Sequence, residues 1–185
     1  MGALDGRRIA VVATDGVEEI ELLGPRDAVL AEGATVDLIS LSADPIQAMN
    51  SDIDKAGTYE VDKVAQDVRA TDYDGVILPG GTVNADTLRT DPDVLRFVRE
   101  AFDADLPVAA ICHAPWTLVE ADLVRGRTLT SYPSLRTDIR NAGGIAVDGE
   151  VVVDGKLITS RNPDDVPAFC DAVVRLFSRE PASAS

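Results

Sequence analysis

One dipeptide in the chain combines two side chains suited to nucleophilic chemistry. Cys112 and His113 end the apolar run PVAAIC, and His113 is the only histidine among the 185 residues. A thiolate is a strong nucleophile, and an imidazole can take up or release a proton near neutral pH. The pair therefore predicts a cysteine nucleophile with a histidine acid/base beside it, the alternative being a buried structural cysteine.

The residues around the pair predict a sharp turn from a strand into a helix. Pro115 suits the first turn of a helix, so a helix N-terminus would lie close to the sulfur. Such a turn, a nucleophile elbow, exposes its nucleophile, and nearby backbone N–H groups favour the thiolate. We therefore expect a strained backbone at Cys112 and a thiol pKa below its usual value. Cys170 lies in a predicted helix among apolar residues, and we interpret it as structural.

The elements that must position these residues alternate along the chain. Buried strands are predicted at 7–14, 35–42, 74–81 and 107–112, an exposed β segment at 57–68, and a hairpin at 150–160 with its turn at Asp154-Gly155. Helices are predicted at 17–33, after a cap at Asp91, and at 164–180.

This alternation predicts an α/β fold: a single-domain, three-layer sandwich with a mostly parallel sheet flanked by helices. The domain would span residues 1–180, and the segment 181–185 is predicted to be a disordered tail. Sites in such sheets form just past the carboxyl ends of strands, here at Gly80-Gly81 and at Cys112. Glu18 begins a helix after the first strand, so it should lie at the same edge. It is either an acid that stabilises the helix N-terminus or a protonated carboxyl beside the sulfur.

Composition and charge exclude several classes of function. The net charge of −15 disfavours nucleic acids and anionic membrane surfaces as partners, and no apolar run approaches the roughly 20 residues that cross a bilayer. One histidine and two unpaired cysteines cannot build a structural zinc site, and no glycine pattern fits a phosphate. We therefore expect no metal and no cofactor. Two free cysteines favour a cytoplasmic protein.

Four segments resemble the PfpI family, a branch of the class I glutamine-amidotransferase-like superfamily with a flavodoxin-like fold: VILPGG, AAICHAPW, LVRGRTLTSYPSLRTDIRNAGG and EVVVDGKLITSR. The resemblance extends from the first strand to the last helix. The family includes intracellular proteases and proteins described as deglycases or glyoxalases for methylglyoxal adducts. Glutaminase relatives need a distant histidine, which this chain lacks.

The resemblance implies roles for individual residues. Cys112 and His113 match the family's catalytic pair, and Glu18 matches its acid at the start of the first helix. Gly81 matches its oxyanion-hole glycine, with the N–H of His113 as the second donor. In the protease branch an acid from a neighbouring subunit orients the histidine, and Asp86 is the best match, with Asp in place of Glu. A homodimer or a higher homo-oligomer is therefore expected.

Three functions follow as hypotheses. The first is a stress-protective enzyme, in which Cys112 attacks small carbonyl compounds or methylglyoxal-derived adducts, as in a deglycase or glyoxalase. The second is an intracellular peptidase that uses Cys112, His113 and Asp86 across a subunit boundary. The third is a redox sensor or chaperone-like stress protein without turnover, since a reactive thiol oxidises readily.

Overall fold

The computed structural model describes residues 2–178 and contains one seven-stranded sheet in the order β10-β11-β7-β6-β1-β2-β5. Its strands are β1 (Arg8–Val12), β2 (Thr35–Ser40), β5 (Lys63–Val64), β6 (Gly75–Leu78), β7 (Val108–Ile111), β10 (Val151–Asp154) and β11 (Leu157–Ser160). All neighbours are parallel except β10 and β11, which form the predicted hairpin. The predicted α/β sandwich is confirmed, while residues 179–180 and the predicted tail lie outside the described residues.

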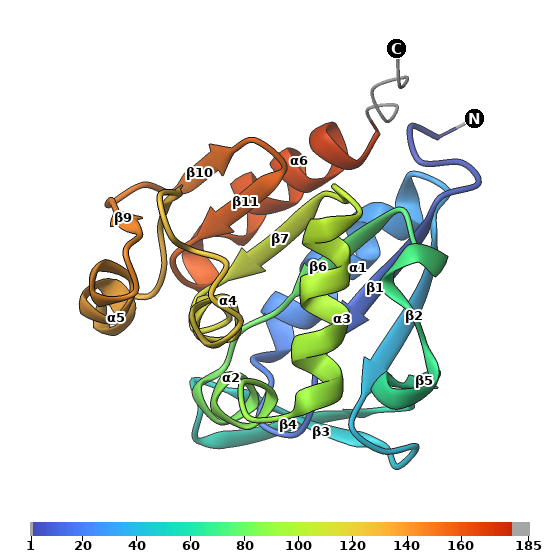
Figure 1. The fold of residues 1–185 in the computed structure, drawn as a ribbon. Coiled ribbons are helices and arrows are strands. Elements are labelled where there is room, and N and C mark those ends of the chain that lie inside the picture. Colours follow the sequence, from blue (N-terminus) through green and yellow to red (C-terminus); the bar gives the residue numbers. More distant parts are fainter. Residues whose placement is uncertain (1, 179–185) are drawn as a thin grey trace.

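Helices cover both faces of this sheet (Figure 1). On one face lie α1 (Glu19–Ala31) and α6 (Val166–Phe177), and on the other lie α3 (Pro92–Asp103), α4 (Pro115–Glu120) and α5 (Arg136–Asn141). Successive strand residues point to opposite faces, so Ile9 and Val11 pack with α1 and α6, whereas Ala10 and Val12 pack with α3. Continuous apolar strands are therefore buried on both sides, as the sequence predicts.

Local sequence explains how two of the helices begin and pack. The Asp91 carboxylate accepts hydrogen bonds of 2.9 Å from the N–H groups of Asp93 and Val94, which confirms the predicted cap of α3. Helix α1 continues through Pro25, and at Gly24 it approaches α6 so closely that a Cβ would lie 2.5 Å from Val166. Glycine therefore permits the tight contact between α1 and α6.

The chain between the predicted strand at 35–42 and the end of the predicted β segment at 57–68 folds differently from expectation. Strand β3 (Ile46–Asn50), which the sequence analysis missed, pairs with β4 (Asp54–Tyr59) in an antiparallel hairpin outside the main sheet. The predicted β segment at 57–68 is divided between the end of β4, the short β5 and a 3₁₀ turn (Ala65–Asp67). Further 3₁₀ turns are Ala70–Asp72, Pro133–Leu135 and Pro163–Asp165, and β8 (Thr128–Leu129) pairs with β9 (Ile145–Ala146).

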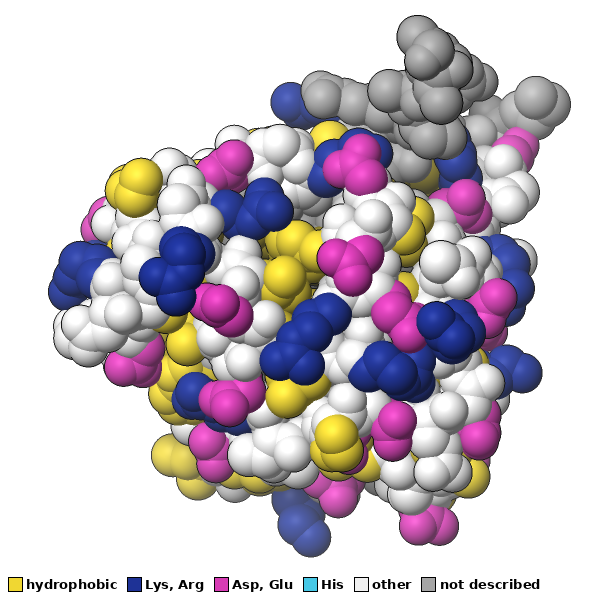
Figure 2. Space-filling model, viewed as in Figure 1, with side chains coloured by type: hydrophobic (Ala, Val, Ile, Leu, Met, Phe, Trp, Pro, Cys, Tyr) yellow, Lys and Arg dark blue, Asp and Glu magenta, His cyan; other side chains and the backbone are white. Residues whose placement is uncertain are grey.

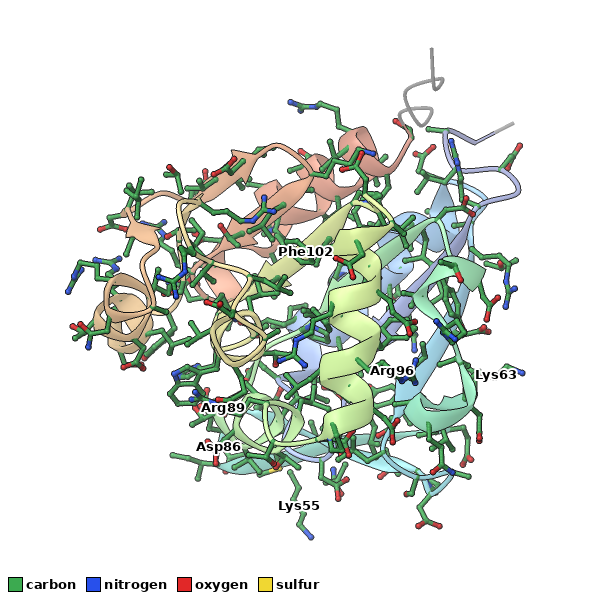
Figure 3. All side chains as sticks on the ribbon, viewed as in Figure 1. Lys55, Lys63, Asp86, Arg89, Arg96 and Phe102 are labelled. Atoms are coloured by element: carbon green, nitrogen blue, oxygen red, sulfur yellow. The ribbon has the colours of Figure 1, made fainter. Side chains whose placement is uncertain are left out.

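The surface carries charges of both signs. Figure 2 shows acidic and basic side chains interspersed over the face that carries α3, without a continuous basic patch on that face. Lys55 projects outward from β4 in Figure 3. Within residues 2–178, no helix is both long and apolar enough to cross a membrane.

Candidate active site

Cys112 lies at the end of β7, where the chain turns sharply towards α4. Its φ is +64°, a left-handed conformation that costs a residue with a Cβ roughly 1–2 kcal/mol. The turn is held on both sides, because the Cys112 N–H donates to the carbonyl of Ser160 at 3.1 Å and its carbonyl accepts from the N–H of Tyr132 at 2.9 Å. The predicted strained turn between a strand and a helix is confirmed.

His113 contacts the sulfur directly. Its Nδ1 lies 3.1 Å from Sγ of Cys112, and its ring stacks on Tyr132 and meets the edge of Trp116. The residue is only 6% exposed, and this burial lowers the pKa of the imidazole. The histidine is therefore neutral at neutral pH and can accept a proton.

Two backbone N–H groups face the sulfur from different elements. Those of Gly81 and His113 both donate towards Sγ and act to lower the pKa of the Cys112 thiol. Gly81 precedes α2 (Thr82–Leu88) at a φ of +91°, and a Cβ there would lie 2.2 Å from the carbonyl oxygen of Gly16. Only glycine fits this position, so its N–H is fixed beside the sulfur.

A buried amide holds the loop that carries Gly81. Oδ1 of Asn84 accepts from the N–H of Thr14, and its Nδ2 donates to the carbonyls of Pro79 and Gly80 at 3.1 and 3.0 Å. This amide ties the ends of β1 and β6 together. The sequence analysis missed Asn84. The signal was a polar residue in the first turn of a helix that follows the PGG loop, where its side chain can hydrogen-bond the backbone of that loop.

The carboxyl beside the sulfur belongs to Glu21, not to Glu18 as predicted. Glu21 is fully buried in the first turn of α1, hydrogen-bonds the Cys112 side chain, and accepts from the Gly80 N–H at 3.0 Å. Its Oε1 has no nitrogen or oxygen partner within the part of the chain that the structure describes. The expectation failed because the N-cap Glu18 turns towards the β3–β4 hairpin, whereas Glu21, three residues further along the helix, is directed at the sulfur.

The carboxylate of Glu18 has a different task. Its two oxygens accept from the N–H groups of Ser51 and Asp52 at 3.0 and 3.4 Å. Both donors have left-handed backbone conformations, with φ values of +54° and +61°, at the tip of the β3–β4 hairpin. Glu18 therefore stabilises a strained turn, and only its charge acts on Glu21.

Burial dominates the ionisation of the Cys112–Glu21 pair. Desolvation, and next the charge of Glu18, raise the pKa of Glu21 to about 8, so this carboxyl is protonated at neutral pH. Burial, and next the negative charge of an ionised Glu21, raise the pKa of the Cys112 thiol. This opposes the predicted lowering of the thiol pKa. While Glu21 keeps its proton the repulsion is absent, and the two groups titrate as a pair.

Two further candidates lie away from the sulfur within this chain. Asp86 is exposed on α2, on the same helix end as Arg89 (Figure 3), and its expected place beside a partner's His113 stays a prediction. Arg161 forms an ion pair with the buried Asp165 at 2.9 Å and another with Asp148 at 3.0 Å. Arg161 follows a predicted strand end, where it could either face the site or pair with a nearby aspartate, and the structure shows the pair.

The sequence analysis also missed a polar pair next to His113. Thr82 Oγ1 lies 3.4 Å from Nε2 of His113, and Asp52 accepts from both the hydroxyl and the N–H of Thr82 at 2.8 and 2.7 Å. The polar cluster Asn50-Ser51-Asp52 is a turn signal that could have revealed the hairpin. Among the described residues, no group of three or more His, Cys, Asp or Glu side chains is placed to hold a metal ion.

The fold and this site define an α/β protein with a cysteine on a sharp turn between a strand and a helix. The family model of the DJ-1/PfpI family matches residues 7–176, and the chain belongs to that family. It is 39% identical over 174 residues to "Protein/nucleic acid deglycase 2" of Escherichia coli, covering 92% of this chain and 98% of the relative.

Two other relatives agree with this assignment. "Putative cysteine protease YraA" of Bacillus subtilis is 39% identical over 163 residues, covering 88% of this chain and 94% of the relative. The crystal structure of Drosophila melanogaster DJ-1beta superposes with a TM-score of 0.82 at 29% identity, covering 94% of this chain and 91% of that one.

Proposed function

We propose that this protein is a cysteine-dependent, stress-protective hydrolase of the cytoplasm that acts on methylglyoxal or on its adducts with protein amines. One observation carries the proposal: the Cys112 thiol is only 5% exposed and lies among a neutral carboxyl, a neutral imidazole and two N–H donors. Such a site suits addition to a small carbonyl carbon. The deglycase name of an Escherichia coli relative supports the same chemistry.

The proposed reaction begins with transfer of the Cys112 proton to Nδ1 of His113, 3.1 Å away. Sγ then bonds to the aldehyde carbon, and the N–H groups of Gly81 and His113 stabilise the resulting oxyanion. Glu21, in place of the predicted Glu18, gives its proton to the oxygen on the second carbon and takes the proton from the first carbon, which forms an enediolate. Glu21 then delivers that proton to the second carbon, which gives the lactoyl thioester, and the proton on His113 returns to Glu21. Water hydrolyses the lactoyl thioester and releases lactate and the free thiol.

Burial and charge favour particular substrates. A nucleophile that is 5% exposed is accessible to a two- or three-carbon carbonyl compound more easily than to a folded polypeptide. The relative's name includes nucleic acids, but a net charge of −15 disfavours binding of a polyanion. We therefore propose free methylglyoxal and glycated amines as the substrates.

The test follows methylglyoxal loss and lactate formation by the wild type and by two matched variants. Cys112→Ser is expected to lower the rate by about 100-fold or more, because a serine hydroxyl loses its proton far less readily than a thiol and is a weaker nucleophile. Cys170→Ser is the control and should retain the wild-type rate. Equal turnover by wild type and Cys112→Ser would refute the proposal.

A peptidase is the second candidate, and the name of the Bacillus subtilis relative favours it. In this version Asp86 of a neighbouring copy orients His113, so the active form is a homodimer or a higher homo-oligomer. Peptide hydrolysis that disappears in Asp86→Asn and depends on oligomer formation would support it. Hydrolysis by a monomer would exclude the intersubunit triad.

A further inference from the structure

A continuous chain of polar contacts leads from the sulfur to the surface within a single copy of the protein. Cys112 contacts Nδ1 of His113, Nε2 of that ring contacts the Thr82 hydroxyl, and the hydroxyl contacts Asp52. Glu18 holds the hairpin tip that carries Asp52. These residues come from β7, α2, the β3–β4 hairpin and the start of α1, so the fold assembles them from four separate segments.

We propose that Thr82 and Asp52 are positioning residues that fix the proton of His113 on Nε2 and leave Nδ1 free to accept the thiol proton. The inference deepens the proposed function, because it assigns the groups that prepare its base. It requires no residue of a second subunit.

The direction of each hydrogen bond follows from the donors and acceptors present. A carboxylate oxygen can only accept, so the Thr82 hydroxyl donates its hydrogen to Oδ2 of Asp52 at 2.8 Å. The hydroxyl oxygen then presents a lone pair to Nε2 of His113 at 3.4 Å, and Nε2 must carry the hydrogen. In a neutral imidazole the other nitrogen is then an acceptor, and it lies 3.1 Å from Sγ.

The Asp52 side chain is itself held at both oxygens. Oδ1 accepts from the Thr82 N–H at 2.7 Å, while Oδ2 accepts from the hydroxyl. The backbone of Asp52 is fixed by Glu18, and the hairpin is tied down where the Met49 N–H donates to the Val17 carbonyl at 2.8 Å. An exposed aspartate at a hairpin tip would otherwise be mobile, so these contacts explain how it can keep a neighbour oriented.

Only one proton moves in the proposed transfer, and each of the other hydrogens along the chain of contacts stays in place. The thiol hydrogen of Cys112 moves to Nδ1, which gives a thiolate and an imidazolium. The hydrogens on Nε2 and on the Thr82 hydroxyl stay on their atoms, and the charge of Asp52 stabilises the cation through the hydroxyl. Asp52 accordingly acts to raise the pKa of His113 against the lowering by burial.

Other groups around the ring do not select the same tautomer. Ser134 Oγ lies 3.5 Å from Nε2, but its hydroxyl can donate or accept. The remaining titratable or charged groups nearby are Tyr132, stacked on the ring, and Arg89 and Asp138, which contact Trp116 rather than the ring. Glu21 contacts the sulfur.

The experiment uses the sole histidine as its own reporter. Nitrogen-15 NMR of the full chain gives one pair of imidazole signals, which report both the tautomer and the pKa without turnover. The wild type is expected to carry its hydrogen on Nε2. Asp52→Asn should lower the His113 pKa by about half a unit, since the negative charge that acts on the ring through the Thr82 hydroxyl is removed. It should also shift the hydrogen towards Nδ1, because an amide N–H that donates to Thr82 turns the hydroxyl towards the ring.

Matched variants separate positioning from a general loss of structure. Thr82→Val removes the hydroxyl and should weaken the Nε2–H preference, Thr82→Ser should restore it, and Asp52→Asn combined with Thr82→Val should add little. Asp54→Asn removes an equal charge from the same hairpin and should leave the tautomer unchanged. The neutral-pH rate of Cys112 alkylation should fall by about tenfold or more in Asp52→Asn and Thr82→Val.

Two results would overturn the inference. One is an identical His113 tautomer and pKa in the wild type, Asp52→Asn and Asp54→Asn. The other is a His113 that responds to Asp86→Asn but not to Asp52→Asn, which would assign the orienting acid to a partner subunit. A protein that turns over no methylglyoxal would count against the proposed function alone, because these signals do not depend on a substrate.

Discussion

Cys112 and Cys170 are the same side chain in two regions of the molecule, and burial acts on both in the same direction. Cys170 lies on α6 against Gly24 of α1, where burial and next the charge of Asp171 raise the pKa of its thiol to about 11. Burial also raises the pKa of the Cys112 thiol. Only Cys112, however, has an imidazole nitrogen 3.1 Å from its sulfur. Reactivity therefore depends on groups that can take the proton and stabilise the charge, not on exposure.

The two regions also differ in their backbones. Cys170 is part of a regular helix. Cys112 has a φ of +64°, and Gly81, whose N–H faces the sulfur of Cys112, has a φ of +91°. A strained backbone conformation persists only where the surrounding structure holds it in place, and such conformations are found most often at functional sites. The Cys112 region is thus a part of the fold in which local strain coincides with the proposed chemistry.

The largest difference between the two regions is expected in the loss of stability when alanine replaces Gly81, near Cys112, or Gly24, near Cys170. A Cβ at Gly81 would meet backbone atoms of Gly16 and Glu18 at 2.2 and 2.7 Å, and its positive φ adds strain. Gly81→Ala should therefore lower the free energy of unfolding by on the order of 3 kcal/mol. At Gly24 the Cβ would meet only side chains, Val166 at 2.5 Å and Cys170 at 3.7 Å, which can shift more easily than backbone, and alanine favours the helix by about 1 kcal/mol.

Urea unfolding of both variants measures this difference. Gly24→Ala should stay close to the wild type, because the gain in helix propensity offsets the repacking against α6. If the two substitutions lowered stability equally, the backbone near Cys112 would be no more constrained than an ordinary contact between helices.

The second effect concerns Glu21, for which the Cys170 region has no counterpart. In the folded protein its pKa of about 8 lies above the ordinary value of 4.5, so between these values the folded state binds more protons than the unfolded state. Stability must then fall as the pH rises through that window. The total is on the order of a few kcal/mol at about 1.4 kcal/mol per unit.

Glu21→Gln removes the ionisation while preserving the shape of the side chain. Relative to the wild type, its free energy of unfolding should rise steadily from pH 5 to pH 8 in urea titrations. A constant difference over this range would mean that Glu21 is ionised in the folded protein at neutral pH, and the proposed proton transfer would lose its acid.

The sequence predicts the parts of the fold that depend on strong periodic patterns. Buried apolar strands and the Asp91 cap each combine a hydrophobic run with a residue of restricted conformation, and the structure confirms them. The turn at Cys112 was predictable for the same reason. The predicted hairpin also forms, but its two-residue turn is Gly155-Lys156 instead of Asp154-Gly155, because Asp154 pairs with Leu157. The hairpin β3–β4 was missed because Ile46 and Ala48 are its only well-buried residues in the first strand.

The candidate site was harder to predict because it depends on side-chain direction. Glu18 and Glu21 both occur at the start of one helix, and nothing in the sequence VEEIEL tells which carboxyl faces the sulfur. That choice is set by Gly80, whose missing Cβ leaves room for Glu21 and Cys112 to meet. Thr82 and Asp52, 30 residues apart, meet only through a hairpin that lies outside the main sheet.

The third effect is chemical and compares the thiols directly. With a small alkylating reagent near pH 8, Cys112 should be modified about tenfold faster than Cys170, because His113 can accept its proton. Peptide mass spectrometry of partially modified protein measures both rates in one sample. Faster modification of Cys170, the less buried thiol, would show that access outweighs the local acid/base groups.

The smallest change in stability is expected for Glu18→Gln, which tests whether Glu18 takes part in proton transfer or only stabilises the hairpin tip. In Glu18→Gln one carboxylate oxygen is replaced by an NH2 group, which cannot accept, so one of the hydrogen bonds from Ser51 and Asp52 is lost. The free energy of unfolding should fall by about 1 kcal/mol. Removing the charge of Glu18 also removes a cause of the raised pKa of Glu21, so the loss of stability between pH 5 and pH 8 should become slightly smaller.

Because the carboxylate of Glu18 binds the hairpin tip at Ser51 and Asp52, the alkylation profile of Cys112 should change far less in Glu18→Gln than in Glu21→Gln. The two variants make the same Glu→Gln substitution three residues apart at the start of α1, so each is the control for the other. A Cys112 profile that responded to Glu18→Gln as strongly as to Glu21→Gln would place Glu18 in the proton transfer after all.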